Sequence, residues 1–173
     1  MKSTISNQKM QEIVENYSDE ILRMSYLYLN NLDAAYEVVQ NVFIKVYLHY
    51  WQFNGRSSER TWIFRIAINE CKNYLKSAWK TKVILSDHLS KETYEQEYDS
   101  SSNDELMSII QALPSKYKEV VLLYYYNELK IREISKVLHL SQSTVGSRLI
   151  KARELLKQEM RERNVYEKFQ RLL

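Results

Sequence analysis

The side chains best suited to specific chemistry form a run of small polar and basic residues near the C-terminus. On a helix with about 100° per residue, Val145, Leu149 and Ala152 share one side, which we expect to be buried. The residues that point outward or flank this stripe are Ser143, Thr144, Ser147, Arg148, Lys151 and Arg153. In a DNA major groove, hydroxyls can contact base edges and arginine can bind guanine through two hydrogen bonds. The pattern therefore predicts a DNA-binding helix.

A shorter helix is predicted just before this one. Its apolar face comprises Ile131, Ile134, Val137 and Leu138. Residues 138–141 form a tight turn, and Ser141 or Ser143 is the expected N-cap of the second helix. Two short helices joined by such a turn are typical of a helix-turn-helix. An ordinary helical hairpin with a basic face also fits the pattern.

A second candidate surface lies on the helix predicted for residues 61–79. The residues expected on its core side are Phe64, Ala67, Ile68, Cys71, Leu75 and Ala78. Another side carries one tryptophan, two amides and three cations: Trp62, Arg65, Asn69, Lys72, Asn73 and Lys76. This composition suits contacts with unstacked bases and phosphates. It also fits a tryptophan at the edge of the core beside a solvated strip.

The helix before it, for which Asp33 is the expected N-cap, has an apolar stripe and an opposite face of mixed character. That opposite face contains Glu37, Gln40, Asn41, Ile44 and Leu48. A purely solvated face has no need of Ile44 and Leu48, which favours a docking role for it. Singly exposed apolar residues are nevertheless common on protein surfaces, so a partner and a bland surface both stay open.

Catalytic and metal-binding chemistry finds no support in the sequence. His49, His88 and His139 are scattered, with no spacing typical of metal ligands. The single cysteine, Cys71, excludes a disulfide framework and a zinc site with several thiolates. Two isolated glycines exclude glycine-rich phosphate loops. We therefore expect no enzyme activity, no metal and no cofactor.

These surfaces must be positioned by helices. The 173 residues include only 2 glycines and 1 proline, too few turn formers for a β-sandwich or barrel. Residues 83–104 have 1 basic and 6 acidic residues and little apolar content, which predicts a linker. Residues 130–173 have 11 basic and 5 acidic residues, which favours a polyanionic partner. With no transmembrane run and no signal peptide, an all-α, soluble, intracellular protein is expected.

Several of these segments resemble known motifs. Residues 113–121, Ile134-Ser135, 143–149 and 151–153 are similar to region four of bacterial sigma factors, and residues 35–43 and 61–69 to region two. Order, spacing and length resemble the small extracytoplasmic-function (ECF) group of the sigma-70 family. Three places depart from the usual pattern. The family usually has a more acidic stretch where this chain reads Tyr36-Glu37 and Gln40-Asn41, so some charge is missing from the face that would bind polymerase. Glu59-Arg60 stands where an apolar residue is common, and His139 occupies a turn position that is often glycine.

The resemblance implies two small helical domains, at residues 1–82 and 105–173, joined by the acidic linker at residues 83–104. The face from Glu37 to Leu48 would dock on RNA polymerase core. Asn69, Asn73 and the segment through Lys76, Lys80 and Lys82 would hold the melted minus-ten promoter element, and residues 143–151 would lie in the minus-thirty-five element. The polymerase, not this chain, would form the bonds.

The resemblance further implies an inhibitory partner, an anti-sigma factor, which would cover these surfaces and could hold the protein at the membrane. The main alternative is a stand-alone helix-turn-helix regulator that acts without being a polymerase subunit. Such a regulator needs a dimer interface or a sensor domain, and residues 1–82 match neither pattern.

Overall fold

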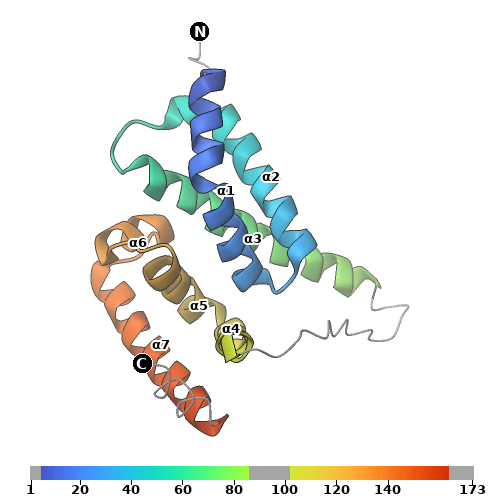
Figure 1. The fold of residues 1–173 in the computed structure, drawn as a ribbon, viewed down its shortest axis with the longest axis vertical. Helices are drawn as coiled ribbons and strands as arrows, with labels where there is room; N and C mark the ends of the chain where they lie inside the picture. The colour runs from blue at the N-terminus through green and yellow to red at the C-terminus, as the bar shows by residue number, and fades with distance from the viewer. Residues whose placement is uncertain (1–4, 86–101, 164–173) are drawn as a thin grey trace.

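The computed structural model describes residues 5–85 and 102–163, and within these ranges the secondary structure is helical, without strands (Figure 1). The elements in chain order are α1 (Asn7–Leu29), α2 (Leu32–His49), the 3₁₀ helix η1 (Tyr50–Gln52), α3 (Glu59–Leu85), α4 (Ser102–Ala112), α5 (Ser115–Val121), the π-helical segment η2 (Leu122–Tyr126), α6 (Ile131–Leu138) and α7 (Gln142–Glu162). The all-α fold class is confirmed. Most of the predicted linker lies outside the described residues, since α3 continues to Leu85 and α4 begins at Ser102.

Helices α1, α2 and α3 pack together as an N-terminal bundle. Each helix presents one apolar stripe to the others, because buried residues recur at the three- and four-residue spacing of a helix. The fully buried side chains include Ile13, Ile21 and Val42, together with Phe64 and Ile68 from α3. The core of this bundle is therefore built from one apolar stripe on each helix.

Asparagines close the gap between α1 and α2. Asn30 ends α1 in a left-handed conformation (φ 52°), which asparagine tolerates better than most residues. Asn31 is the N-cap of α2, and its side chain accepts a hydrogen bond of 2.8 Å from the backbone N–H of Ala34. The prediction of Asp33 as the cap was wrong: Asn31 already satisfies a free N–H of the first turn, so Asp33 lies inside the helix.

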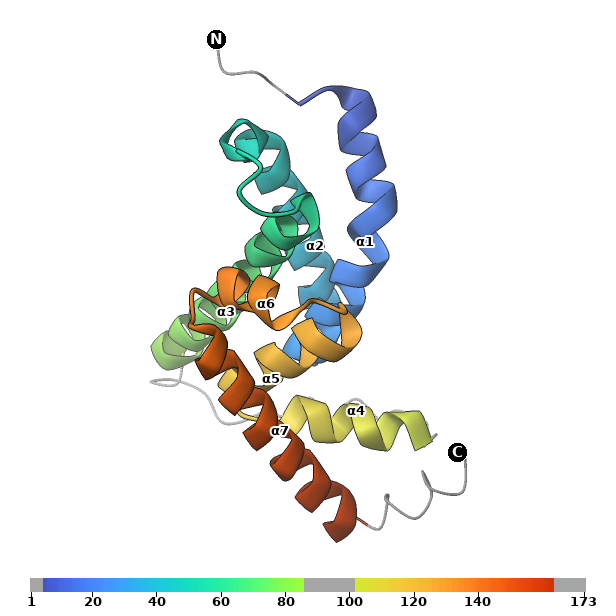
Figure 2. The same cartoon turned by 90° about the vertical axis from the view of Figure 1, so that its left-hand side faces the viewer.

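Helices α4 to α7 form a C-terminal bundle, and α6 contacts α3, in front of which it lies in Figure 2. The two bundles share one buried core, since Leu123, Ile134 and Leu149 belong to the same apolar cluster as Phe64. Helix α1 also contacts α4 and η2. The described parts of the two bundles are thus packed directly against each other.

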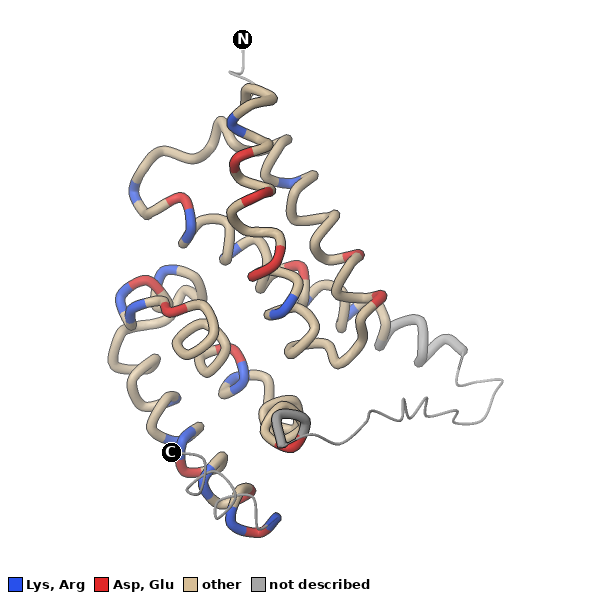
Figure 3. The backbone as a smooth tube through the Cα atoms, in the orientation of Figure 1, with Lys and Arg blue, Asp and Glu red and all other residues tan. Residues whose placement is uncertain are grey.

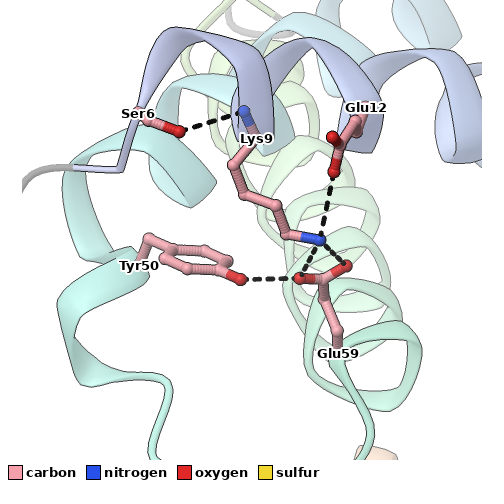
Figure 4. A network of polar contacts seen from close by, with 5 residues as sticks. All are labelled: Ser6, Lys9, Glu12, Tyr50 and Glu59. Carbon is pink, nitrogen blue, oxygen red and sulfur yellow. Dashed lines mark hydrogen bonds and ion pairs between the residues drawn. The ribbon is translucent and has the colours of Figure 1, made fainter.

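The start of α3 is held by a polar network (Figure 4). Glu59 accepts a hydrogen bond of 2.7 Å from the Tyr50 hydroxyl and lies 3.1 Å from the ammonium of Lys9 on α1. Burial, reinforced by the bond to Glu59, raises the pKa of Tyr50 to about 12, so this hydroxyl remains a donor. The network therefore ties the start of α3 to α1 and to η1.

The core side of α3 is shorter than predicted. Ile68 and Cys71 are fully buried, but Leu75 is 39% exposed and Ala78 is exposed as well. In Figure 1, the C-terminal end of α3, near residue 85, extends past the helices that pack against the rest of α3. An apolar stripe predicts which side of a helix faces its bundle, but not where the bundle ends.

A pair of alanine substitutions on α3 separates these two environments. Ile68→Ala is expected to lower the free energy of unfolding by about 2–5 kcal/mol, because it removes a fully buried side chain and leaves a cavity. Leu75→Ala, on the same helix but exposed, is expected to change it by about 0.5 kcal/mol or less. Urea unfolding followed by circular dichroism measures both. Equal losses would contradict the placement of α3.

Candidate nucleic-acid interface

Helices α6 and α7 form the predicted helix-turn-helix. His139 ends α6 in a left-handed conformation (φ 54°), so histidine fills the turn position without glycine. Ser141 is the N-cap of α7, and its hydroxyl accepts a hydrogen bond of 3.1 Å from the backbone N–H of Thr144. Val145 and Leu149 are buried, which sets the opposite side of α7 toward solvent.

The six residues predicted to contact duplex DNA lie on the free surface of α7 or flank it. Ser143, Ser147, Lys151 and Arg153 are exposed, and Thr144 and Arg148 are half-buried. Two of the cations already have partners: Lys151 lies 2.9 Å from Glu154, and the Arg153 guanidinium donates a 2.8 Å hydrogen bond to the Tyr125 hydroxyl. Acidic and basic residues alternate along the second half of α7 (Figure 3). The N-terminal half of the helix, up to Ile150, contains no acidic residue.

The predicted single-strand surface on α3 is divided into a free part and a covered part. Asn69, Asn73 and Lys76 are exposed, and Asn73 donates a 3.2 Å hydrogen bond to the Glu70 carboxylate. Lys72 instead lies 3.1 Å from Glu119 of the C-terminal bundle. The side chains of Lys80 and Lys82 lie outside the described residues. Of the residues predicted to contact the melted strand, Asn69, Asn73 and Lys76 therefore lie on an exposed face of α3.

Trp62 and Arg65 line a hollow of about 470 Å³ beside the free part of α3. The hollow is bordered by Gln52, Phe53, Asn54, Arg56, Ser57, Trp62, Arg65, Lys136 and His139, none of which is acidic. The Trp62 ring packs against Phe53 and Tyr50, with centroids 5.6 and 5.9 Å apart. Trp62 is therefore held by an aromatic cluster and borders the hollow at the same time. Sequence reasoning found Trp62 and Arg65 but not the loop residues, because their proximity depends on the turn before α3.

The mixed face of α2 is open to solvent. Ile44 and Leu48 are each 55% exposed, Glu37 and Gln40 are exposed, and Asn41 is half-buried. Tyr47 and Trp51, also exposed, extend the apolar part of this face, and sequence reasoning did not include them. Residues 44, 47, 48 and 51 have the spacing of side chains on one side of a helix, so the sequence pattern could have identified Tyr47 and Trp51 as part of this face. Several exposed large apolar side chains together are typical of a docking surface.

Polar contacts join the two bundles around one buried carboxylate. Glu119 accepts a 3.1 Å hydrogen bond from the Tyr28 hydroxyl and pairs with Lys72, so α5 is tied to both α1 and α3. Burial, followed by the nearby Glu119 charge, raises the pKa of Tyr28 above its ordinary value and keeps the hydroxyl protonated. Arg60 forms a second bridge: it pairs with Glu20 at 2.7 Å and donates to the Asn127 carbonyl at 2.8 Å.

A third set of contacts lies at α6. The Lys136 ammonium donates a 2.9 Å hydrogen bond to the Arg56 carbonyl, and the Thr61 hydroxyl donates to Glu133 at 3.2 Å. Helix α6 therefore closes one side of the hollow that Trp62 borders. In this arrangement of the two bundles, Ser143 and Ser147 in the N-terminal half of α7 are exposed to solvent, whereas Lys72 is paired with Glu119.

The described residues offer no evident catalytic centre. Cys71 is fully buried, and burial raises the pKa of its thiol to about 12, which makes it a poor nucleophile at neutral pH. In residues 5–85 and 102–163, no three histidine, cysteine or acidic side chains are placed to hold a metal ion. Within the same ranges, no helix is both long and apolar enough to span a membrane.

Models of known protein families match the N-terminal and the C-terminal part of the chain. Residues 13–81 match the family model for sigma-70 region 2, and residues 103–156 match the model for sigma-70, region 4. The first match contains α2 and most of α3, and the second contains the helix-turn-helix. Both candidate DNA-binding surfaces therefore lie inside matched regions.

Curated relatives match over most of their length. The chain is 28% identical over 165 residues to the ECF RNA polymerase sigma factor SigW of Bacillus subtilis. The alignment covers 87% of this chain and 88% of SigW. The chain is also 28% identical over 162 residues to the ECF RNA polymerase sigma-E factor of Haemophilus influenzae, with 86% and 85% covered.

Solved structures share the fold. The sigma factor RpoE of Bartonella quintana, in complex with the anti-sigma factor NepR, matches with a TM-score of 0.71 and 17% identity, covering 87% of this chain and 96% of that chain. CnrH, in complex with the cytosolic domain of CnrY, matches with a TM-score of 0.70 and 18% identity, covering 91% and 90%. With about nine tenths of this chain covered, the likeness extends over both bundles.

Proposed function

Since this chain belongs to the sigma-70 family and resembles its ECF members, we propose that it is an alternative sigma factor. It binds RNA polymerase core and directs transcription initiation at specific promoters. The observation that carries the proposal is the pairing, in one chain, of the helix-turn-helix face on α7 with the Trp62–Asn73 face on α3. The first suits duplex DNA and the second suits unstacked bases, and initiation requires both.

The open face of α2 is the polymerase-binding surface in this proposal. Its exposed apolar centre, Ile44 and Leu48, is bordered by the polar side chains of Glu37, Gln40 and Asn41. An apolar centre with a polar rim is the usual composition of a protein–protein interface. The face lies away from the C-terminal bundle, so the contact between the bundles leaves it free.

The free part of α3 binds the melted minus-ten element. Asn69 and Asn73 supply amide donors and acceptors for base edges, and Lys76 supplies a cation for phosphate. The hollow beside them, with Trp62 on its wall and Arg65 at its border, suits a base that has left the stack. Lys72 joins this surface when it is released from Glu119.

The N-terminal half of α7 binds the minus-thirty-five element in the major groove. Ser143, Thr144 and Ser147 offer hydroxyls, and Arg148 can form two hydrogen bonds to guanine. Lys151 and Arg153 are placed for phosphate contacts, which strengthen binding to all sequences alike. This division assigns base selection to one part of the helix and general affinity to the other.

An anti-sigma factor is the regulatory partner in this proposal. The described bundles already contact each other, with Lys72 held by Glu119 and α6 beside the hollow. The partner therefore need not sit between the bundles: it covers the exposed α2 face and also contacts the C-terminal bundle, and this second contact stabilises the closed arrangement. Support comes from RpoE and CnrH, whose structures contain the anti-sigma factor NepR and the cytosolic domain of CnrY. A membrane-anchored partner would hold the protein at the membrane.

The chain itself performs no bond-forming step in this account, since the polymerase supplies that chemistry. A stand-alone helix-turn-helix regulator is less favoured, because it gives no role to the exposed α2 face or to the amides on α3. It would bind its promoter duplex specifically without polymerase, which makes the two proposals separable.

Run-off transcription with purified polymerase core on a promoter library tests the proposal. Transcripts from specific promoters are expected only when the protein is added. The double variant Ile44→Asp/Leu48→Asp is expected to weaken core binding by about 10- to 100-fold, because it removes two apolar contacts. Leu32→Asp, a similarly exposed leucine on another side of α2, is the matched control and should bind normally. Tight, specific promoter binding without polymerase would contradict the proposal.

Asn69→Ala and Asn73→Ala are expected to reduce promoter melting by about 5- to 100-fold each, because each removes hydrogen bonds to unstacked bases worth about 1–3 kcal/mol. Both side chains are exposed, so folding should be unaffected. Permanganate footprinting measures the melting, and a core-binding assay runs beside it. Gln11→Ala, which removes an exposed amide on α1, serves as control. Loss of core binding in step with melting would instead indicate a structural role.

The anti-sigma proposal predicts a stoichiometric partner other than polymerase. Affinity capture from membrane and soluble fractions is expected to recover it with the wild type but not with Ile44→Asp/Leu48→Asp, because the α2 face is lost. The recovered protein, once purified, should inhibit run-off transcription. Recovery of polymerase subunits alone in both fractions, with and without stress, would contradict this part of the proposal.

A further inference from the structure

We propose that Ile150 contacts the C5-methyl group of a thymine in the upstream promoter element and makes the protein prefer thymine at that position. The inference rests on the proposed function and adds a specificity-determining residue to it. Ile150 is 58% exposed, the highest value among the exposed large hydrophobic side chains that the structure describes. Nothing in the packing of α7 explains an apolar residue there.

The position of Ile150 on α7 places it with the residues assigned to DNA. It follows Ser147 by three residues and Ser143 by seven, a spacing that puts the three side chains on one side of a helix. Leu149, about 100° away around the helix, faces the core and is 1% exposed. Helix α7 lies at the edge of the molecule in Figure 1, and the 58% exposure of Ile150 shows that no other described helix covers this side chain.

The neighbours of Ile150 favour a DNA contact over a protein contact. Exposed residues around it on α7 are the hydroxyl of Ser147, the Lys151 and Glu154 ion pair, and Arg153. A docking surface for a protein has adjoining apolar side chains, as the α2 face does with Ile44, Tyr47 and Leu48. A single apolar side chain among hydroxyls, cations and one acidic side chain that is paired with Lys151 fits a surface that is polar except at one point. The thymine methyl is such an apolar point in the major groove.

The size of the effect follows from the chemistry. Burial of one methyl or methylene group is worth about a fourfold change in a binding constant. Cytosine and deoxyuridine lack the methyl group, and deoxyuridine keeps the same pairing edge as thymine. Exchange of thymine for deoxyuridine therefore isolates the contact that Ile150 is proposed to make, without changing any hydrogen bond.

The test uses holoenzyme, reconstituted from polymerase core and this protein, on a promoter that it transcribes. Each thymine of the upstream element, on either strand, is replaced in turn by deoxyuridine, and binding is measured by competition. With the wild type, one replacement is expected to weaken binding about three- to fivefold. Ile150→Ala should weaken binding to the parent promoter by a similar factor and show no further loss with that replacement. Ile150→Val should keep most of the response.

Arg148→Ala is the matched control: it should weaken binding but still respond to the replacement, because it leaves Ile150 in place. Equal responses of the wild type and Ile150→Ala at every position would overturn the inference, as would the lack of any response. A loss of core binding by Ile150→Ala would overturn it too, since Ile150 would then contact polymerase. Failure of the wild type to support transcription would instead contradict the proposed function itself.

Discussion

The buried stripe of α3 is the constraint on which the other surfaces depend. Phe64, Ile68 and Cys71 are fully buried against α1 and α2, and this packing fixes the rotation of α3 about its axis. Because successive residues on a helix are about 100° apart, that rotation also decides where Asn69 and Asn73 point. One packing interaction thus holds the N-terminal bundle together and presents the amides to solvent. A change of core volume in α3 would alter the proposed single-strand surface even if it touched none of the polar residues.

The two charged residues at the start of α3 show how a departure from a family pattern can be accommodated. An apolar residue is common where Glu59 and Arg60 stand, yet both have partners here. Glu59 binds Lys9 and Tyr50, and Arg60 pairs with Glu20 and reaches the Asn127 carbonyl. Charges and hydrogen bonds therefore perform the anchoring that apolar contact would otherwise provide. The Arg60 bridge also joins the bundles, a role that an apolar side chain could not fill through hydrogen bonds.

The helices and the helix-turn-helix could be predicted because their signals are local. The apolar stripe of α7, its Ser141 cap and the left-handed turn at His139 involve residues only a few positions apart. The contact between the bundles could not be predicted in this way, because Tyr28 and Glu119 are 91 positions apart in the chain. No periodicity marks such a pair. The exposed end of the α3 stripe at Leu75 was missed for the same reason, since burial there depends on how far the other helices reach.

The engagement of Lys72 by Glu119 couples the arrangement of the bundles to DNA binding. In the proposed function, Lys72 contacts the melted strand, but in the closed arrangement its ammonium is held at 3.1 Å by a buried carboxylate. One cation cannot fully serve both partners, so promoter DNA and the C-terminal bundle compete for it. A ligand shifts such an equilibrium only by the difference in its affinity for the two arrangements. Polymerase, by binding the bundles separately, would favour the open arrangement and free Lys72, whereas a partner that prefers the closed one would keep it paired. The Lys72–Glu119 ion pair therefore gives a physical reason why polymerase would promote promoter binding and a partner that prefers the closed arrangement would oppose it.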